Sequence, residues 1–287
     1  MFSFMQKMRS FQRNFSVSSS FPLLPLQLPS PMETHVWFVL PDEFKSVSLL
    51  NQYMELLSPC EKENVLSMRG DQLQKRALLA RTLVRTTIAR LWESDDGQCP
   101  SPLHFNISHT SSLIACGVTV NSPIGIDVEE KQRKIKNNIL AFARRYFSLY
   151  EVEHLSAISD SEVQRQEFVK LWILKEAYVK ALGRGFSAAP FKTFTIREKD
   201  ATNSGASEVV VESSDHPVSL TNNWQFGLFE LASSHYAAVC MEKDKTSDVA
   251  MRVPMRLTVR KTIPFVEDIC ISGTDAVVPI AGLIKQV

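Results

Sequence analysis

The chain has 287 residues, 44% of them hydrophobic and 22% charged, which is the composition of a globular protein with one large core or two smaller ones. A formal net charge of +1 excludes a global field for binding nucleic acid, so any anion-binding site must be local. We therefore expect no nucleic acid as a partner. No apolar run approaches the ~20 residues of a membrane helix, so we do not expect a membrane as a partner either. The five cysteines form no CxxC pair, which favours reduced thiols over a disulfide framework or a zinc site.

The amino-terminal segment differs in composition from the rest of the chain. Residues 1–31 carry basic residues, several serines and several phenylalanines, and the first acidic residue of the chain is Glu33. This composition is typical of a transit peptide, and we expect a mitochondrial matrix location, with the plastid and the cytosol as alternatives. The four prolines of 22–31 exclude a helix interior and indicate a linker before a fold that begins near residue 32.

The first half of the chain has clear helix and strand signals. Ser58, followed by Pro59 and Glu61, predicts a helix start with serine as the N-cap. Between residues 72 and 91 the apolar residues recur every three or four positions, which predicts an amphipathic helix. Strands are predicted from β-rich composition at 34–40, 104–108 and 113–120.

The second half is predicted to contain one long helix and several strands. The helix covers 161–182, with Glu162 in its first turn and Gly183 as the residue that ends it. The strands are expected at 123–129, 191–196, 208–211, 224–231 and 236–241. Because helices and strands alternate without a βαβ rhythm, the predicted fold class is α+β, a mixed α/β architecture rather than a doubly wound sheet. Residues 246–287 contain no recognisable motif and form a C-terminal extension of unknown role.

The segment PIGIDVEE at 123–130 contains two acidic residues on one strand face. Asp127 and Glu129 are expected ~6.6–6.8 Å apart, because alternate side chains of a strand point the same way. Two carboxylates at such a short distance repel each other, and a shared proton or a hard cation relieves the repulsion. The alternative interpretation is a solvated acidic face at an exposed strand end.

The segment LWILKEAYVKAL at 171–182 places charged residues on one helix face. Glu176 and Lys180 are four residues apart, so they are neighbours on the helix surface, with Lys175 beside them. The alternative interpretation is a surface ion pair that contributes only tenths of a kcal/mol.

The segment HFNISHT at 104–110 ends a predicted strand with polar residues. Ser108 and His109 supply a hydroxyl and an imidazole beside free backbone N–H groups, and such groups suit phosphate oxygens. The alternative interpretation is a strand end capped by Ser and Thr. Each of the three segments is a weak signal when it is taken alone.

Together, FNISH, IGIDVE and WxxKExxxKxxG in this order resemble the Sfp-type 4′-phosphopantetheinyl transferase family, in a plant-like organellar form. The resemblance covers roughly residues 33–242 and extends upstream to Ser58-Pro59 and to Arg76 of the RALL segment. It implies two similar α/β halves related by a pseudo-twofold axis, here 32–122 and 123–245, with the active site between them.

The resemblance also implies a reaction, in which a serine of an apo acyl carrier protein attacks the β-phosphate of coenzyme A and expels 3′,5′-ADP. It implies Mg²⁺ held by Asp127, Glu129 and Glu176, and it implies Asp127, Glu176 and Lys180 as catalytic residues. The coenzyme contacts that it implies are Arg76, Ser108, His109, Lys175 and Lys180. Such residues suit a reaction that depends on positioning and on stabilising charge at diphosphate oxygens. One chain with both halves is expected to work as a monomer.

Two departures from the family pattern define an alternative function. The family's SPxK segment reads SPCE here, and 91–103 is short and acidic, without the lysine expected to contact the coenzyme. The alternative is therefore a weakened or inactive member that binds carrier protein or coenzyme A. A serine hydrolase is excluded because Ser108 and His109 are adjacent on a strand and point to opposite faces. A P-loop enzyme is excluded because GxxxxGK[ST] is absent.

Overall fold

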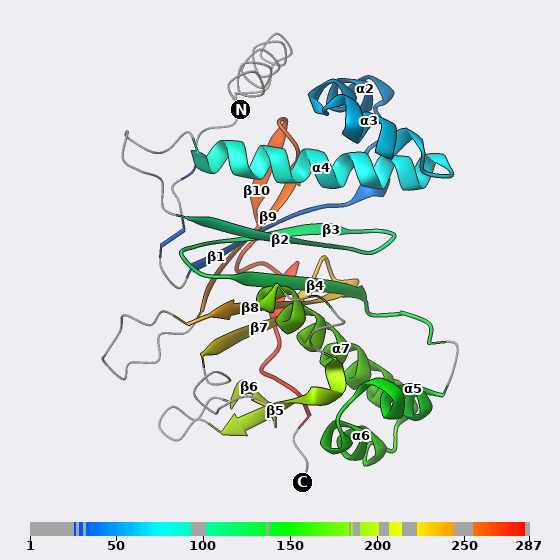
Figure 1. The fold of residues 1–287 in the computed structure, drawn as a ribbon, viewed down its shortest axis with the longest axis vertical. Coiled ribbons are helices and arrows are strands. Elements are labelled where there is room, and N and C mark those ends of the chain that lie inside the picture. Colours follow the sequence, from blue (N-terminus) through cyan, green and yellow to red (C-terminus); the bar gives the residue numbers. More distant parts are fainter. Residues whose placement is uncertain are drawn as a thin grey trace.

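A computed structural model describes residues 26, 29–30, 33–92, 102–135, 138–183, 185, 190–200, 207–213, 223–243 and 255–284. Two β-sheets lie face to face, and one long helix covers the outer face of each (Figure 1). The layers are α4 (Asp71–Trp92), a five-stranded sheet A, a four-stranded sheet B and α7 (Ser161–Leu182). This arrangement confirms the predicted α+β fold class. No helix within the described ranges is long and apolar enough to cross a bilayer.

The amino-terminal half supplies three strands of sheet A and the helices above them. β3 pairs antiparallel with both β1 and β2, and β2 forms one edge of the sheet. The elements before and after α4 are β1 (Glu33–Val39), η1 (Pro41–Glu43), α2 (Val47–Leu56), α3 (Pro59–Leu66), β2 (Leu103–His109) and β3 (Ile114–Val120).

The second half supplies sheet B, a smaller two-stranded sheet and the helices around α7. In sheet B the order is β11-β7-β8-β4, so β4 forms the edge that meets β2 of sheet A. The elements are β4 (Ile124–Glu130), α5 (Ile139–Tyr146), α6 (Leu149–Ser156), η2 (Phe191–Thr193), β5 (Phe194–Asp200), β6 (Ser207–Ser213), β7 (Trp224–Leu231) and β8 (His235–Glu242).

The C-terminal extension, whose role the sequence leaves open, belongs to both sheets. β9 (Arg256–Ile263) pairs parallel with β1, and β10 (Glu267–Cys270) pairs with β9 at the outer edge of sheet A. β11 (Val277–Pro279) then pairs with β7 in sheet B. Farther on, Leu283 is buried in the core around α7, so this segment packs against both halves of the molecule.

Local signals explain where the two long helices begin and end. Asp160 caps α7 by accepting hydrogen bonds from the N–H groups of Glu162 and Val163, both at 2.9 Å. Gly183 ends the helix at φ +65°, a left-handed conformation that favours glycine. Both ends agree with the prediction, as do the bounds of α4 within one residue at each end.

One predicted strand begins later than expected. The segment 191–196 was expected to be a strand, but its first three residues form η2, a single turn of 3-10 helix, and β5 begins at Phe194. The turn is stabilised by Pro190, whose carbonyl oxygen accepts hydrogen bonds from the N–H and the hydroxyl of Thr193. This local closure outweighs the β propensity of the segment.

Candidate functional site

The two sheets meet along their edge strands β2 and β4, where side chains take the place of a backbone ladder. Asn106 accepts a hydrogen bond from the N–H of Ile126 at 3.1 Å, and Ser108 accepts one from the N–H of Val128 at 3.3 Å. These two residues share one face of β2, as the alternation of side chains along a strand requires. The two halves of the molecule are therefore joined at this edge by an amide and a hydroxyl side chain.

A glycine in β4 lets α7 lie directly against this strand. A Cβ atom on Gly125 would come within 1.9 Å of the carbonyl oxygen of Ala177 and 2.5 Å of the N–H nitrogen of Ala181. Only a residue without a side chain fits so close to a helix backbone. This close approach brings Glu176 and Lys180, which lie on the same helix face, beside the acidic face of β4.

Asp127 is the centre of the polar contacts at this junction. Its Oδ1 accepts a hydrogen bond from the Ser108 hydroxyl at 2.7 Å and forms an ion pair with the Lys180 ammonium, also at 2.7 Å. Lys180 additionally donates to the carbonyl oxygen of Ile126 at 3.0 Å. Asp127 is buried, so these donors replace the hydrogen bonds that water would otherwise make to its carboxylate.

The other two acidic residues of the motifs lie in the same electrostatic environment. Burial and the charge of Asp127 raise the pKa of Glu176 to about 7, with Glu129 adding to the effect and Lys180 and Arg133 opposing it. Burial also raises the pKa of Glu129, although its ion pair with Arg133 works in the opposite direction. Asp127 is thus close enough to Glu129 and Glu176 to raise the pKa of both.

The side chains around these acids already neutralise part of their charge. Arg133 pairs with Glu129 and lies over the Trp172 ring at 5.5 Å from the ring centre, while Lys180 pairs with Asp127. Among the described residues, no three His, Cys, Asp or Glu side chains are arranged to hold a metal ion as they stand. The carboxylate oxygens are nevertheless the donor type that a hard divalent cation takes.

Lys175 does not lie where the resemblance implied. Its side chain is fully buried and pairs with both carboxylate oxygens of Glu151, at 2.6 and 2.8 Å, and it donates to the carbonyl oxygen of Phe194 at 2.7 Å. Burial lowers the pKa of Lys175 to about 8, although Glu151 opposes the shift. A fully enclosed ammonium cannot contact a coenzyme in this structure. The coenzyme contact that the resemblance implied for Lys175 is therefore wrong.

The other implied coenzyme contacts lie in different settings. Ser108 is buried and its hydroxyl proton is used by Asp127, so it orients a carboxylate rather than presenting a donor to a ligand. His109 is exposed as the last residue of β2. Arg76 is half-buried near the start of α4, where its Nε donates to the carbonyl oxygen of Gln72 at 3.3 Å. In Figure 1 the start of α4 and the β2–β3 turn lie at the same side of the molecule.

A histidine that the sequence did not single out contacts the turn after His109. The buried His235, at the start of β8, has its Nε2 at 3.0 Å from the Thr110 hydroxyl and 3.1 Å from the Ser112 hydroxyl. Ser112 in turn donates to Glu130 at 2.8 Å. No local signal marks His235, because its partners lie more than 120 residues earlier in the chain.

Comparison with known proteins identifies the family. The family model described as the 4′-phosphopantetheinyl transferase superfamily matches residues 123–240. The 4′-phosphopantetheinyl transferase Sfp of Bacillus subtilis strain 168 is 32% identical over 160 residues, which cover 51% of this chain and 68% of the relative. The chain belongs to the 4′-phosphopantetheinyl transferase superfamily. The match of the model contains β4 and α7, and hence all four charged residues of the junction: Asp127, Glu129, Glu176 and Lys180.

Further members of the superfamily match shorter stretches of the chain. A 4′-phosphopantetheinyl transferase of Bacillus subtilis is 34% identical over 139 residues, 44% of this chain and 59% of the relative. Among solved structures, holo-[acyl-carrier-protein] synthase of Thermotoga maritima matches 44% of this chain and 66% of its own chain, at 23% identity and a TM-score of 0.31. The membership in the superfamily depends on the sequence matches and not on this structural overlap.

Proposed function

We propose that this chain transfers the 4′-phosphopantetheine arm of coenzyme A to a serine of an apo acyl carrier protein, releasing 3′,5′-ADP. The observation that supports the proposal best is the group of Asp127, Glu176 and Lys180 where β4 and α7 meet. The relatives named 4′-phosphopantetheinyl transferase support the same reaction class. Carrier protein and coenzyme are therefore the proposed partners, and one chain supplies every residue proposed for the site.

The proposed roles follow from charge and exposure. Lys180 is an ammonium next to the acidic cluster, with 27% of its side chain exposed, so it can neutralise charge that develops on a diphosphate. Glu176 lies beside Asp127 and Lys180 on the helix face that meets β4, so its carboxyl group is proposed to accept the proton of the attacking serine, directly or through water. His109 and Arg76 are the exposed and half-buried groups proposed to contact coenzyme phosphates.

Asp127, Glu129 and Glu176 are the residues proposed to hold Mg²⁺. A bound Mg²⁺ supplies positive charge to diphosphate oxygens. The charge of Asp127 raises the pKa of both Glu129 and Glu176, and carboxyl groups this close to one another are a suitable donor set for such an ion. Lys180 and Arg133 pair with two of these acids, so the chain's own cations also limit the repulsion between the carboxylates.

The test is a transfer assay that reads the product directly. The purified chain is incubated with coenzyme A, Mg²⁺ and an apo acyl carrier protein, and the carrier is examined by mass spectrometry. We expect a mass gain of one phosphopantetheine per carrier. Coenzyme that stays intact while the carrier keeps its apo mass would contradict the proposal.

The alternative is a weakened or inactive member, and the composition of 91–103 favours it. This segment is acidic and contains no lysine, and residues 93–101 of it lie outside the described residues. A charge-assisted contact is worth ~1.5–3 kcal/mol, so its loss would weaken coenzyme binding by roughly 10- to 150-fold. Activity that recovers when the coenzyme concentration is raised would assign the defect to this connection. A carrier that never gains mass at any coenzyme concentration would favour the inactive alternative.

The proposed cellular location rests on the leader alone. Residues 1–31, which lie almost entirely outside the described residues, are proposed to direct the chain to the mitochondrial matrix. A fusion of residues 1–31 to a fluorescent protein is expected to label mitochondria. Label in plastids would change the organelle, and diffuse cytosolic label would reject targeting.

A further inference from the structure

The two halves of the molecule repeat one arrangement of helices and contacts. A short helix with a serine N-cap precedes a long helix in each half: α3 before α4, and α6 before α7. Both short helices have eight residues and both long helices have 22. Ser58 and Ser148 are the two N-caps, and each is part of a capping box with a glutamate three residues later. The two helix pairs therefore correspond residue by residue, with 90 positions between equivalents.

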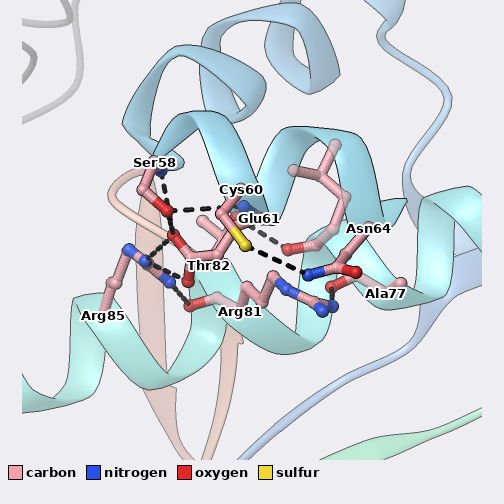
Figure 2. Close-up of polar contacts among 9 residues, drawn as sticks. Ser58, Cys60, Glu61, Asn64, Ala77, Arg81, Thr82 and Arg85 are labelled. Atoms are coloured by element: carbon pink, nitrogen blue, oxygen red, sulfur yellow. Dashed lines mark hydrogen bonds and ion pairs between the residues drawn. The ribbon is translucent and has the colours of Figure 1, made fainter. Parts of the chain in front are cut away.

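In the first half, the capping-box glutamate forms an ion pair with the long helix. Glu61 binds the guanidinium of Arg85, which lies on α4, while it also accepts from the N–H of Ser58 at 2.9 Å (Figure 2). Figure 2 shows that the pair bridges α3 and α4. The contact therefore connects the first turn of α3 to the face of α4 that carries Arg85.

In the second half, Glu151 and Lys175 occupy the equivalent positions. Glu151 accepts from the N–H of Ser148 at 2.9 Å and pairs with Lys175 on α7. The spacing of 24 residues between the two partners is the same in both pairs. Glu151 also accepts from the N–H of Ile196 at 2.8 Å, so this pair connects α6, α7 and β5.

We propose that Lys175 is a positioning residue, which fixes α7 so that the neighbouring Glu176 faces β4. The ammonium is fully buried among the rings of Phe147, Phe191 and Phe194, with the last ring centre 4.1 Å away. The equivalent pair in the first half, Glu61 and Arg85, likewise connects a short helix to a long one. There the residue that follows the cation is Thr86 rather than an acid. The same ion pair is present in the first half, where no acid follows it on the long helix. We therefore assign the pair to the framework of the fold. This inference rests on the proposed function, because it assigns Lys175 to the support of Glu176.

The experiment breaks the same pair from either end. Lys175→Met and Glu151→Gln are compared for kcat in the transfer assay and for coenzyme A binding by calorimetry without carrier protein. We expect both to lower kcat by roughly 10- to 100-fold, because displacement of a catalytic group by about 1 Å costs that much. Coenzyme affinity should stay within about twofold in both, since neither residue contacts the ligand. Lys175→Arg should recover most of the kcat, because arginine fills the equivalent position in α4.

A matched control exists in the other half. Glu61→Gln breaks the equivalent pair on α4, and we expect it to lower the melting temperature while kcat stays unchanged. Coenzyme binding that weakens at least about tenfold in Lys175→Met but not in Glu151→Gln would overturn the proposal and restore a direct contact. Unchanged kcat in both variants would overturn it as well.

Two further arms keep the test decisive. If a single variant does not fold, the double variant Lys175→Met/Glu151→Gln, which leaves no unpaired charge, is measured instead against the same expectations. If the unmodified chain transfers nothing, the proposed function fails. A lower melting temperature with unchanged coenzyme binding in both Lys175→Met and Glu151→Gln would then still support the framework role, and an unchanged melting temperature in either variant would reject it.

Discussion

The two halves of this chain share a framework but differ where the long helix meets its strand. In the second half, Gly125 leaves room for α7 to touch β4, and the acids Asp127 and Glu176 meet there. In the first half, the equivalent strand β1 has the large, buried side chains of His35 and Trp37 on one face, and Trp37 packs in the core that contains α4. Glycine thus permits the close approach that brings the acids of the second half together, whereas large rings fill the corresponding positions of the first half.

The cation near the end of the long helix shows the same contrast. Arg90 on α4 pairs with Asp268 of β10, and the two side chains are 8% and 2% exposed. Lys180 on α7 pairs with Asp127, and here the side chains are 27% and 10% exposed. The C-terminal extension thus supplies the buried partner in the first half. In the second half the pair remains within reach of solvent, as the proposed site for a charged substrate requires.

The largest effect is expected from removing the acid that distinguishes the halves. Glu176→Gln should lower kcat by roughly 10²–10⁴-fold, because a positioned general base contributes on that scale. Thr86→Val, the change at the equivalent position of α4, should leave kcat unaltered. Steady-state kinetics with a carrier protein gives both values. Near-normal turnover in Glu176→Gln would remove this residue from the proposed site.

The two aspartates are expected to separate stability from activity. Asp268→Asn should destabilise the fold by about 3–5 kcal/mol, because it leaves the guanidinium groups of Arg90 and Arg260 beside a neutral side chain in a buried setting. Asp127→Asn should cost about 1 kcal/mol or less, because Lys180 can reach water. Urea denaturation of both variants measures the difference. Equal losses of stability would show that the two ion pairs have the same role.

The close approach of α7 can be tested at the strand. Gly125→Ala should destabilise the fold by about 1–3 kcal/mol, because the new methyl group collides with helix backbone and not with a flexible side chain. Gly117→Ala is the control, since its Cβ would meet the end of the Ile124 side chain at 3.0 Å, which can move. In thermal denaturation, Gly125→Ala should have a lower melting temperature than Gly117→Ala. The reverse order would contradict the close packing of α7 on β4.

The smallest effect concerns the pH dependence of the pair in Figure 2. Burial alone would raise the pKa of Glu61, but hydrogen bonds from Arg85 and Ser58 lower it to about 2. A carboxyl group with a lowered folded-state pKa stabilises the fold above its unfolded pKa and loses this contribution as the pH falls. Glu61→Gln should therefore cost about 1–2 kcal/mol at pH 7, after allowance for solvent screening. The difference from the unmodified chain should shrink between about pH 4.5 and pH 2; a constant difference would argue against the ion pair.

Local patterns in the sequence were sufficient for much of the fold. The apolar period of α4, the capping signals of α3 and α7 and the composition of β7 and β8 all act over a few residues, and the predicted elements agree with the structure. The spacing of Asp127 and Glu129 and that of Glu176 and Lys180 likewise follow from strand and helix periods. Such features depend on neighbours in the chain, so they can be read without knowing the tertiary structure.

Contacts between distant segments were decided by the tertiary structure alone. Lys175 is charged and lies one residue from a proposed catalytic acid, yet it is buried because Glu151 on another helix supplies a partner for its charge. Strands β9 to β11 have no motif, and they are positioned by pairing with β1 and β7, which lie far from them in sequence. The burial of a charge and the pairing of a strand depend on which partner folding brings near, and residue type and spacing do not contain that information.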